Sequence, residues 1–253
     1  MEKLKDKVCV VTGAAGGIGK ATAELFLSHG AKVMLVDLTE DDLRNVTQSM
    51  NKERTATFAA DVSKLADNKA ITEATLSKFG RIDIAFLNAG IEGKFFPISQ
   101  YPEDVFDRVI AVNLKGVWLG CQQLIPKMSQ GGSVIITSSV AGLKGFAHLG
   151  AYVASKHAVV GIMKTAALEF ADKGIRVNSI HPGPVNNRMM HSIEEQIHPE
   201  QPADSRKDFE ANIPFVRYAE NSEIADLALF LASDDSKYMT GTTQVIDGGM
   251  IIK

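Results

Sequence analysis

Short runs of β-branched and other apolar residues alternate with amphipathic segments along almost the whole of this chain. Seven such runs are predicted as strands: Lys7–Thr12, Lys32–Asp37, Thr55–Ala59, Ile82–Asn88, Ser133–Thr137, Arg176–Ile180 and Thr243–Ile246. Segments with helical periodicity lie between them. Strands that are apolar throughout and separated by helices are typical of a parallel sheet that is covered on both faces. We therefore predict an α/β fold with helices on both sides of one parallel sheet.

Residues that commonly cap helices stand at three of the predicted junctions. The first helix is expected to end at Gly30, since glycine readily adopts the backbone conformation of a C-terminal cap. Thr39 is expected to be the N-cap of the second helix, whose first turn is acidic. Ser63 is expected to open the third helix in the same way.

Composition limits the possible classes of protein. The 253 residues, 45% of them hydrophobic, suffice for a sizeable core, and we predict a single domain over residues 1–253. The net charge is −3 and no Lys or Arg run indicates nucleic acid or a membrane as a partner. Cys9 and Cys121 stand in apolar stretches, which favours buried free thiols in a reducing compartment. The apolar run near the N-terminus is too short for a signal sequence or a membrane span, so a cytoplasmic location is expected.

One long polar segment interrupts the alternation. Residues 186–221 follow the sixth predicted strand and contain three prolines. Insertions of this length in a compact domain are usually functional or mobile. Ligands of open parallel sheets bind beyond the carboxyl ends of the strands, which is where this segment begins. We predict that it forms a lid over a substrate, the alternative being an ordinary surface excursion.

A glycine-rich turn joins the first strand to the first helix. Its sequence is TGAAGGIG, residues 12–19, in which Gly13, Gly17 and Gly19 allow a tight turn and close approach of the backbone to a pyrophosphate. The unpaired N–H groups and the dipole at the start of the helix favour the same anion. The spacing differs from the usual G-x-G-x-x-G, because three residues separate the first two of these glycines. The position between a strand and a helix still predicts a dinucleotide site.

Asp37 ends the second strand, eighteen residues after Gly19. A carboxylate at this position can accept hydrogen bonds from both hydroxyls of an adenosine ribose, and it would repel a 2′-phosphate. The next three residues, 38–40, supply no compensating cation. The sequence therefore predicts NAD rather than NADP as the cofactor.

Two other strand ends suit the adenosine part of a dinucleotide. Asp61 and Val62 follow the third strand, where a carboxylate could meet an adenine amino group. Asn88, Ala89 and Gly90 follow the fourth strand, where small residues let the backbone approach a ribose. Each set is also compatible with an ordinary turn after a strand.

Tyr152 and Lys156 are four residues apart in GAYVASKHAVVG, which places both side chains on one face of a helix. A phenol titrates near ~10, but a nearby ammonium favours the phenolate and lowers that pKa. A tyrosine with a lowered pKa can take the proton of an alcohol while a nicotinamide takes the hydride. The spacing alone arises often by chance, so the pair gains its meaning from the dinucleotide turn.

Together these motifs place the chain beside a known family. TGAAGGIG, NAG, Asn113 in AVNLKG, Ser139 in IITSSVAG, Tyr152-x-x-x-Lys156 and PGPV stand in an order and spacing that resembles the short-chain dehydrogenase/reductase family, from residue 5 to about residue 250. The resemblance implies a single Rossmann-like, doubly wound domain with a seven-stranded parallel sheet, and commonly a homotetramer. It also implies hydride transfer between a nicotinamide and a small-molecule alcohol or ketone.

The resemblance implies a role for each matching residue. Tyr152 would be the general acid and base, and Lys156 would bind the nicotinamide ribose and lower the pKa of the tyrosine. Ser139 would hold the substrate oxygen, with its neighbour Ser138 as the alternative. Asn113 would orient a water that connects Lys156 with solvent, the alternative being a helix-interior side chain turned outward. The predicted cofactor contacts are Gly13, Gly17, Ile18, Gly19, Asp37, Asp61, Val62, Asn88, Ala89, Gly90, Tyr152, Lys156, Pro182, Gly183, Val185 and Asn187.

The chain departs from the family pattern at two positions. Asn187 stands where the family often has a threonine that meets the nicotinamide carboxamide, and its amide can both donate and accept. Leu87 stands where the family often has an asparagine, which alters packing without touching catalysis.

A mostly apolar set of residues is predicted to line the substrate pocket: Glu92, Gly93, Phe95, Ala141, Phe146, Leu149, Pro184, Met189 and Met190. Such a lining suits a medium-sized, largely neutral alcohol or ketone. Glu92 is expected either to bind a substrate hydroxyl or to be a solvated loop charge. His191 and His198 have no third partner at metal-ligand spacing, so no metal site is predicted.

Two other functions stay open at this point. One is an NADP-dependent carbonyl reductase of 3-oxoacyl type, against which Asp37 and the lack of a basic patch argue. The other is a nucleotide-sensing protein without catalysis, against which the combined presence of Tyr152, Lys156, Ser139 and Asn113 argues. The last strand, Thr243–Ile246, fits a sheet edge that a second subunit covers, in a homotetramer or homodimer.

Overall fold

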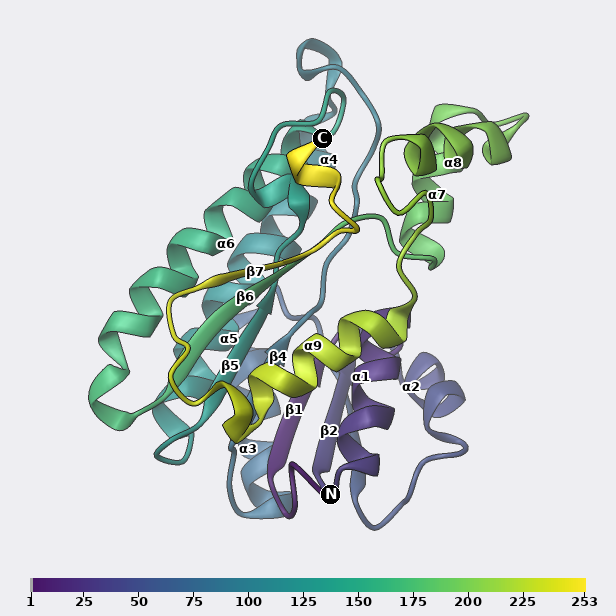
Figure 1. Cartoon of the computed structure of the whole chain (residues 1–253). Helices are drawn as coiled ribbons and strands as arrows, with labels where there is room; N and C mark the ends of the chain where they lie inside the picture. The colour runs from purple at the N-terminus through teal and green to yellow at the C-terminus, as the bar shows by residue number, and fades with distance from the viewer. Residues whose placement is uncertain (1) are drawn as a thin grey trace.

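The computed structural model describes residues 2–253, so Met1, the first residue of the predicted domain, lies outside the described residues. Its centre is a seven-stranded parallel sheet in the order β3-β2-β1-β4-β5-β6-β7 (Figure 1). The strands are β1 (Val8–Thr12), β2 (Lys32–Asp37), β3 (Thr55–Ala59), β4 (Ile84–Leu87), β5 (Ser133–Thr137), β6 (Arg176–Pro182) and β7 (Thr243–Ile246). The predicted doubly wound, Rossmann-like sheet is confirmed.

Two strands differ from their predicted bounds. β4 is shorter than the predicted Ile82–Asn88, because the N–H of Asn88 turns to the hydroxyl of Thr12 at 3.0 Å instead of continuing the ladder. β6 runs beyond the predicted Ile180 to Pro182, since its last residues pair with β7. The position of β7 at one edge of the sheet agrees with the prediction.

Helices cover both faces of the sheet (Figure 1). They are α1 (Gly17–Ser28), α2 (Glu40–Thr47), α3 (Leu65–Phe79), α4 (Glu103–Ile110), α5 (Gly116–Leu124), α6 (Gly150–Glu169), α7 (Arg188–Ile197), α8 (Pro202–Ala211) and α9 (Asn221–Ala232). Short 3₁₀ turns lie at η1 (Ile98–Gln100), η3 (Ile125–Lys127), η4 (Val140–Gly142), η5 (Ala171–Lys173), η6 (Asp234–Ser236) and η7 (Met250–Ile252), and η2 (Ala111–Lys115) is a π-helical turn. Phe26 of α1 and Ile224 of α9 belong to one core cluster, and Ile71 of α3 and Met163 of α6 belong to the other. The sheet thus separates two hydrophobic layers.

The predicted caps are partly confirmed. The hydroxyl of Thr39 accepts a hydrogen bond from the N–H of Asp42 at 3.2 Å, as an N-cap does. Gly30, with φ +85°, follows the end of α1 in the left-handed conformation. The expectation for Ser63 is wrong: α3 begins at position 65, and Ser63 donates its N–H and hydroxyl to the carboxylate of Asp61 at 3.0 and 2.6 Å. The Ser63 hydroxyl therefore bonds to the charged Asp61 carboxylate and does not cap the helix.

Residues 186–221 contain α7 and α8, which stand beyond the carboxyl ends of the strands, at the upper right of Figure 1. A small cluster of buried side chains lies at their base: Val140, Ile213, Tyr218 and Met250, with Phe146, Met190 and Phe209 packed against it. Cys9 and Cys121 are buried free thiols, as predicted. Within residues 2–253, no helix is long and apolar enough to cross a membrane.

Candidate functional site

The glycine turn forms a cradle at the carboxyl end of β1. Gly13 has φ +65°, a conformation that favours glycine, and a Cβ at Gly19 would collide with the carbonyl oxygen of Gly13. α1 begins at Gly17, and no side chain caps its first N–H groups. Uncapped N–H groups at a helix start that backbone alone surrounds suit a pyrophosphate. The turn therefore fits the phosphates of a dinucleotide.

Asn221, the first residue of α9, covers the same turn from the side. A Cβ at Gly17 would lie 2.5 Å from the Oδ1 of Asn221. The Nδ2 of Asn221 donates to the carbonyl of Asn186 at 3.2 Å, and its Oδ1 accepts from the Nδ2 of Asn187 at 3.4 Å. No sequence pattern indicates Asn221, because its contact depends on how α9 packs beside α1.

Asp37 is held beside the glycine turn. Its carboxylate accepts hydrogen bonds from the N–H groups of Ala15 and Leu38, both at 2.8 Å. The side chain remains half-buried, with lone pairs left for further donors. This position, at the end of β2 next to the pyrophosphate cradle, fits the adenosine ribose.

The two other predicted adenosine segments differ in their contacts. The amide of Asn88 donates to the carbonyls of Thr12 and Gly13 at 3.2 and 3.3 Å, and it accepts from the Thr137 hydroxyl at 3.1 Å. Residues 88–90 therefore lie directly against the glycine turn. Burial raises the pKa of Asp61, but its hydrogen bonds with Ser63 and its interactions with Lys64 together lower it more, so the net shift is downward. The Asp61 carboxylate accepts hydrogen bonds from Ser63 within the turn that follows β3. Contact of residues 61–62 with adenine stays a prediction.

Lys156 lies on α6 with its ammonium buried beneath the carboxyl end of β5. Its Nζ donates to the carbonyl of Thr137 at 2.8 Å and lies 5.5 Å from the centroid of the Tyr152 ring. Burial lowers the pKa of Lys156 to about 8. A Cβ at Gly90 would lie 3.4 Å from both this Nζ and the Oδ1 of Asn113, so a glycine keeps the space between them open.

The hydroxyls of Tyr152 and Ser139 meet at the same place. Burial raises the pKa of Tyr152 to about 12, a hydrogen bond with Ser139 lowers it, and the charge of Glu92 raises it further. The direction of the net shift is opposite to the sequence-based expectation, because burial is the largest contribution to it. Tyr152 thus lies between Ser139 and the Lys156 ammonium, and the catalytic roles of these three residues stay a prediction.

Asn113 lies in the π-helical turn η2 and is completely buried. Its Nδ2 donates to the carbonyl of Ile91 and the hydroxyl of Ser155 at 2.9 and 3.1 Å, and its Oδ1 accepts from the N–H of Ile91 at 2.8 Å. The alternative of a side chain turned to solvent is therefore wrong. Single π-helical turns within α-helices are frequent at functional sites. Asn113 ties the loop after β4 to the residue that precedes Lys156.

The two candidate serines are distinguished by their partners. The hydroxyl of Ser138 is buried and donates to the carbonyl of Lys156 at 2.8 Å, so it supports α6. The hydroxyl of Ser139 accepts from the N–H of Ala141 at 3.1 Å and lies 3.5 Å from the carbonyl oxygen of Pro182. Because only Ser139 is partly exposed and close to Tyr152, the geometry favours it over Ser138.

The segment after β6 curves around the same point. A Cβ at Gly183 would lie 2.9 Å from the Cα of Asp247, so the close approach of two backbones there needs a glycine. Val185 is buried and pairs with Ala219. Asn187 is the N-cap of α7, with its Oδ1 accepting from two backbone N–H groups at 3.1 and 3.4 Å. Its oxygen is therefore already in use and one amide N–H bonds to Asn221, which leaves the other amide N–H for a carboxamide.

The predicted substrate residues come from three segments: the loop after β4, the chain between β5 and α6, and the chain that leads from β6 into α7. Glu92 is buried and lies 3.6 Å from the guanidinium of Arg188, so the alternative of a solvated loop charge is wrong. The Oε1 of Gln196 on α7 accepts from the N–H of Phe95 at 3.0 Å, a link that the sequence did not reveal. The remaining predicted lining residues are all buried or partly buried: Gly93, Ala141, Phe146, Leu149, Pro184, Met189 and Met190.

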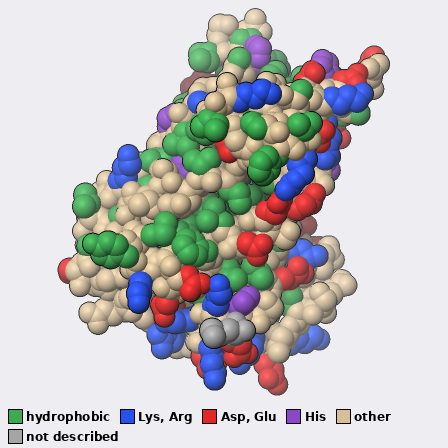
Figure 2. Space-filling model, in the orientation of Figure 1, with side chains coloured by type: hydrophobic (Ala, Val, Ile, Leu, Met, Phe, Trp, Pro, Cys, Tyr) green, Lys and Arg blue, Asp and Glu red, His purple; other side chains and the backbone are tan. Residues whose placement is uncertain are grey.

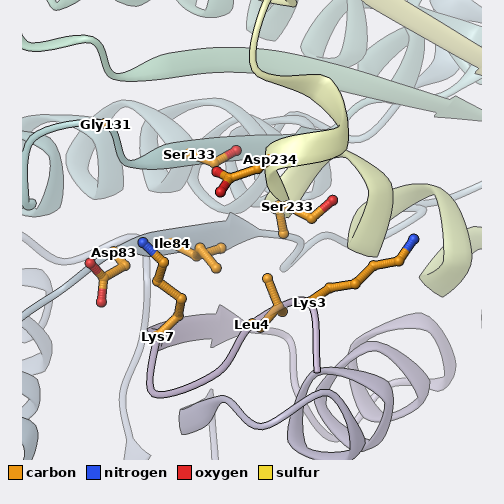
Figure 3. Close-up of a pocket in the computed structure, with 10 residues that line it drawn as sticks. Lys3, Leu4, Lys7, Asp83, Ile84, Gly131, Ser133, Ser233 and Asp234 are labelled. Carbon is orange, nitrogen blue, oxygen red and sulfur yellow. The ribbon is translucent and has the colours of Figure 1, made fainter. Parts of the chain in front are cut away.

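A hollow lies at the amino ends of the strands, at the other end of the sheet from the candidate site (Figure 3). It is lined by Lys3, Leu4, Lys7, Asp83, Ile84, Gly131, Ser133, Ala232, Ser233 and Asp234. The carboxylate of Asp83 is occupied, since it accepts from the N–H of Val8 at 2.9 Å and pairs with Arg81. The Asp83 carboxylate therefore holds the start of β1 in place. The candidate functional site lies at the other end of the sheet, at the carboxyl ends of the strands.

Comparison with known proteins agrees with this geometry. A family model described as enoyl-(acyl carrier protein) reductase matches residues 13–251. Levodione reductase of Leifsonia aquatica is 39% identical over 98% of this chain and 95% of its own. The chain belongs to the short-chain dehydrogenase/reductase family. A crystal structure of levodione reductase superposes with a TM-score of 0.95, covering 98% of this chain and 99% of that one.

Two other relatives of this family member span nearly its whole length. Cyclohexanol dehydrogenase of Acinetobacter sp. strain SE19 is 35% identical, over 99% of this chain and 97% of its own. Trans-4-hydroxycyclohexanecarboxylate dehydrogenase of Sinomonas cyclohexanicum is 37% identical, over 98% of this chain and 94% of its own. As a member of the family, the chain is an oxidoreductase that uses a nicotinamide cofactor.

Proposed function

We propose that this enzyme is an NAD-dependent dehydrogenase or reductase that interconverts a secondary alcohol and a ketone on a cyclohexane ring. The observation that carries the proposal is the convergence of the Tyr152 and Ser139 hydroxyls above the buried ammonium of Lys156. These groups can hold one oxygen atom and move its proton. The ring is favoured because two relatives are named for cyclohexane alcohols.

The proton of the alcohol passes to Tyr152, which acts as general base in oxidation and as general acid in reduction. Ser139 donates its hydroxyl hydrogen to the substrate oxygen as negative charge develops there. Lys156 stabilises the phenolate by its charge, and Asn113 fixes the turn through which a water reaches Lys156. A bound nicotinamide dinucleotide supplies the hydride acceptor or donor.

NAD is the cofactor that we propose, and Asp37 is the reason. Its carboxylate stands at the end of β2 beside the pyrophosphate cradle, fixed by two backbone N–H groups. A 2′-phosphate at that place would meet a negative charge, whereas ribose hydroxyls would find acceptors. Gly13, Gly17, Ile18, Gly19 and residues 88–90 would hold the rest of the dinucleotide.

We assign the segment 186–221 the role of a lid within a single domain of residues 1–253. α7 contributes Met189 and Met190 to the pocket side, and Gln196 and Arg188 connect it to the loop that follows β4. Apolar side chains from this lid suit the carbons of a ring, and Glu92 is placed to accept from a second polar group of the substrate.

A homotetramer or homodimer is part of the proposal. Hydrophobic side chains gather on the face that β7 and α9 occupy (Figure 2). Val245 of the edge strand β7, Leu168 at the end of α6 and Tyr238 are exposed apolar residues. An edge strand with exposed apolar neighbours is commonly covered by a second copy. Light scattering of the purified chain would give the number of copies, and a monomer would contradict this part.

The proposal is tested by a substrate screen read by nicotinamide absorbance at neutral pH. Cyclohexanol, trans-4-hydroxycyclohexanecarboxylate and cyclohexane-1,4-dione are offered with NAD or NADP in the matching redox state, beside acyclic 2-butanol and a 3-oxoacyl thioester. We expect turnover of a ring substrate with the NAD pair. Turnover of the thioester with NADPH alone would favour the alternative of an NADP-dependent carbonyl reductase of 3-oxoacyl type. No turnover of any alcohol or ketone, with dinucleotide still bound, would favour a non-catalytic sensor.

A further inference from the structure

His181 has no place in the proposed chemistry, yet it lies at its centre. The residue is at the end of β6, immediately before Pro182, and its side chain is completely buried. Its Nδ1 lies 2.9 Å from the carbonyl oxygen of Ser139, and its Nε2 lies 2.8 Å from the hydroxyl oxygen of Ser179. Both ring nitrogens therefore have a partner, one on each side of the ring.

The partners determine where the proton sits. A carbonyl oxygen only accepts hydrogen bonds, so Nδ1 carries the proton and Nε2 accepts from the Ser179 hydroxyl. Burial lowers the pKa of His181, the bond to Ser139 opposes that shift, and the charges of Lys156 and His157 add to it. The ring is thus a neutral donor toward the carbonyl of Ser139 at neutral pH.

Ser139 needs such a support because it lies just outside the sheet. β5 ends at Thr137, and the backbone of Ser139 is extended with φ −170° before the turn η4. Its hydroxyl accepts from the N–H of Ala141 at 3.1 Å and lies 3.5 Å from the carbonyl oxygen of Pro182. Its carbonyl accepts from the N–H of Gly142 at 2.8 Å within the turn, and the bond from His181 adds a link from the same carbonyl to β6.

We propose that His181 is a positioning residue for the reaction, holding the Ser139 carbonyl and so the Ser139 hydroxyl within reach of Tyr152 and the substrate oxygen. This inference rests on the proposed function, in which Ser139 binds that oxygen. It predicts that catalysis depends on the donor at Nδ1 and not on the contact at Nε2.

Two substitutions test the two ring nitrogens of His181 separately. Asparagine places its amide nitrogen near the position of Nδ1, whereas glutamine places it near the position of Nε2. We expect His181→Asn to keep kcat for cyclohexanol and NAD⁺ within about threefold, and His181→Gln to lose about tenfold to a hundredfold, as for a lost buried hydrogen bond at a reacting group. The KM for NAD⁺ should stay unchanged in both, and both should lose a similar amount of thermal stability. Equal kcat losses in the two variants, or full activity in His181→Gln, would overturn the proposal.

A second measurement does not depend on turnover. The ¹⁵N spectrum of the histidine rings in the whole wild-type chain should contain a neutral ring with its proton on Nδ1 that is missing from the spectrum of His181→Asn; the comparison is needed because the Nδ1 of His157 also lies 2.9 Å from a carbonyl oxygen, that of Val153. If the signal that disappears came from a ring with its proton on Nε2, the assignment would be wrong. Ser139→Ala separates this inference from the function beneath it. Full activity there would remove the proposed role of Ser139, whereas an inactive Ser139→Ala beside a fully active His181→Gln would remove only the role of His181.

Discussion

The cofactor side and the substrate side of this site are built in different ways. On the cofactor side, glycines keep the space at the end of β1 open, and the side chains of Asp37 and Asn88, at the ends of β2 and β4, bond to backbone groups of the glycine turn. On the substrate side, side chains from the loop after β4 meet side chains from α7, in pairs such as Glu92 with Arg188. The arrangement on the cofactor side follows from the geometry of the sheet. The arrangement on the substrate side depends on the side chains of residues 186–221.

This difference teaches why members of one family share a cofactor and vary in substrate. Changing a residue on the lid leaves the sheet and its glycine turn intact, so the substrate can change without loss of the dinucleotide site. The proposed catalytic residues lie on the boundary, since α6 carries both Tyr152 and Lys156. Substitutions on each side, and at the boundary, should therefore have separable kinetic effects.

A substitution at the boundary between the two sides should have the largest effect on kcat. Tyr152→Phe removes the proton donor and acceptor, and we expect kcat to fall by about 10³-fold or more, as for loss of a general acid and base. NADH binding, measured by nicotinamide fluorescence, should change little, because the ring of the side chain remains. Near-normal turnover would show that another group handles the proton.

Lys156→Met, at the same boundary, should impair both catalysis and cofactor binding. We expect about 10²-fold lower kcat and weaker NADH binding. Although the Tyr152 side chain is only partly buried, loss of hydration raises its pKa to about 12, and removal of the nearby ammonium can only raise it further. Since the base must be deprotonated, the rising limb of the oxidation rate should move to higher pH. Lys156→Arg, which keeps the charge, is the control, and an unchanged pH profile in Lys156→Met would contradict this role.

Sequence and structure agree better on the cofactor side, and the reason is physical. Gly13, Gly19 and Asp37 act through backbone conformation and through their place at strand ends, and both can be read from the order of residues. The contacts of His181 and Asn221 depend on which strand or helix packs beside them, and no local pattern encodes that. The pKa of Tyr152 was misjudged for a related reason: helical spacing reveals a neighbouring charge but not the depth of burial.

The choice of NAD is tested on the cofactor side alone. Asp37→Ala removes the acceptor for the ribose hydroxyls, and we expect kcat/KM with NAD to fall about tenfold or more, as for hydrogen bonds to a charged group. The preference over NADP should narrow, while the KM for cyclohexanol stays the same. Asp37→Asn, which keeps the shape and removes the charge, shows how much of the preference is repulsion of the 2′-phosphate. A strong bias to NAD in both variants would place the choice elsewhere.

The smallest expected effect lies on the substrate side. Gln196→Ala removes the acceptor for the N–H of Phe95, so the loop after β4 and α7 lose a direct link. One such hydrogen bond corresponds to a threefold to tenfold change, which we expect as a rise of about that size in the KM for cyclohexanol. Gln196→Glu keeps an oxygen for the same N–H and should stay closer to wild type. If Gln196→Ala instead raised the KM for NAD, α7 would serve both sides, and the division between them would fail there.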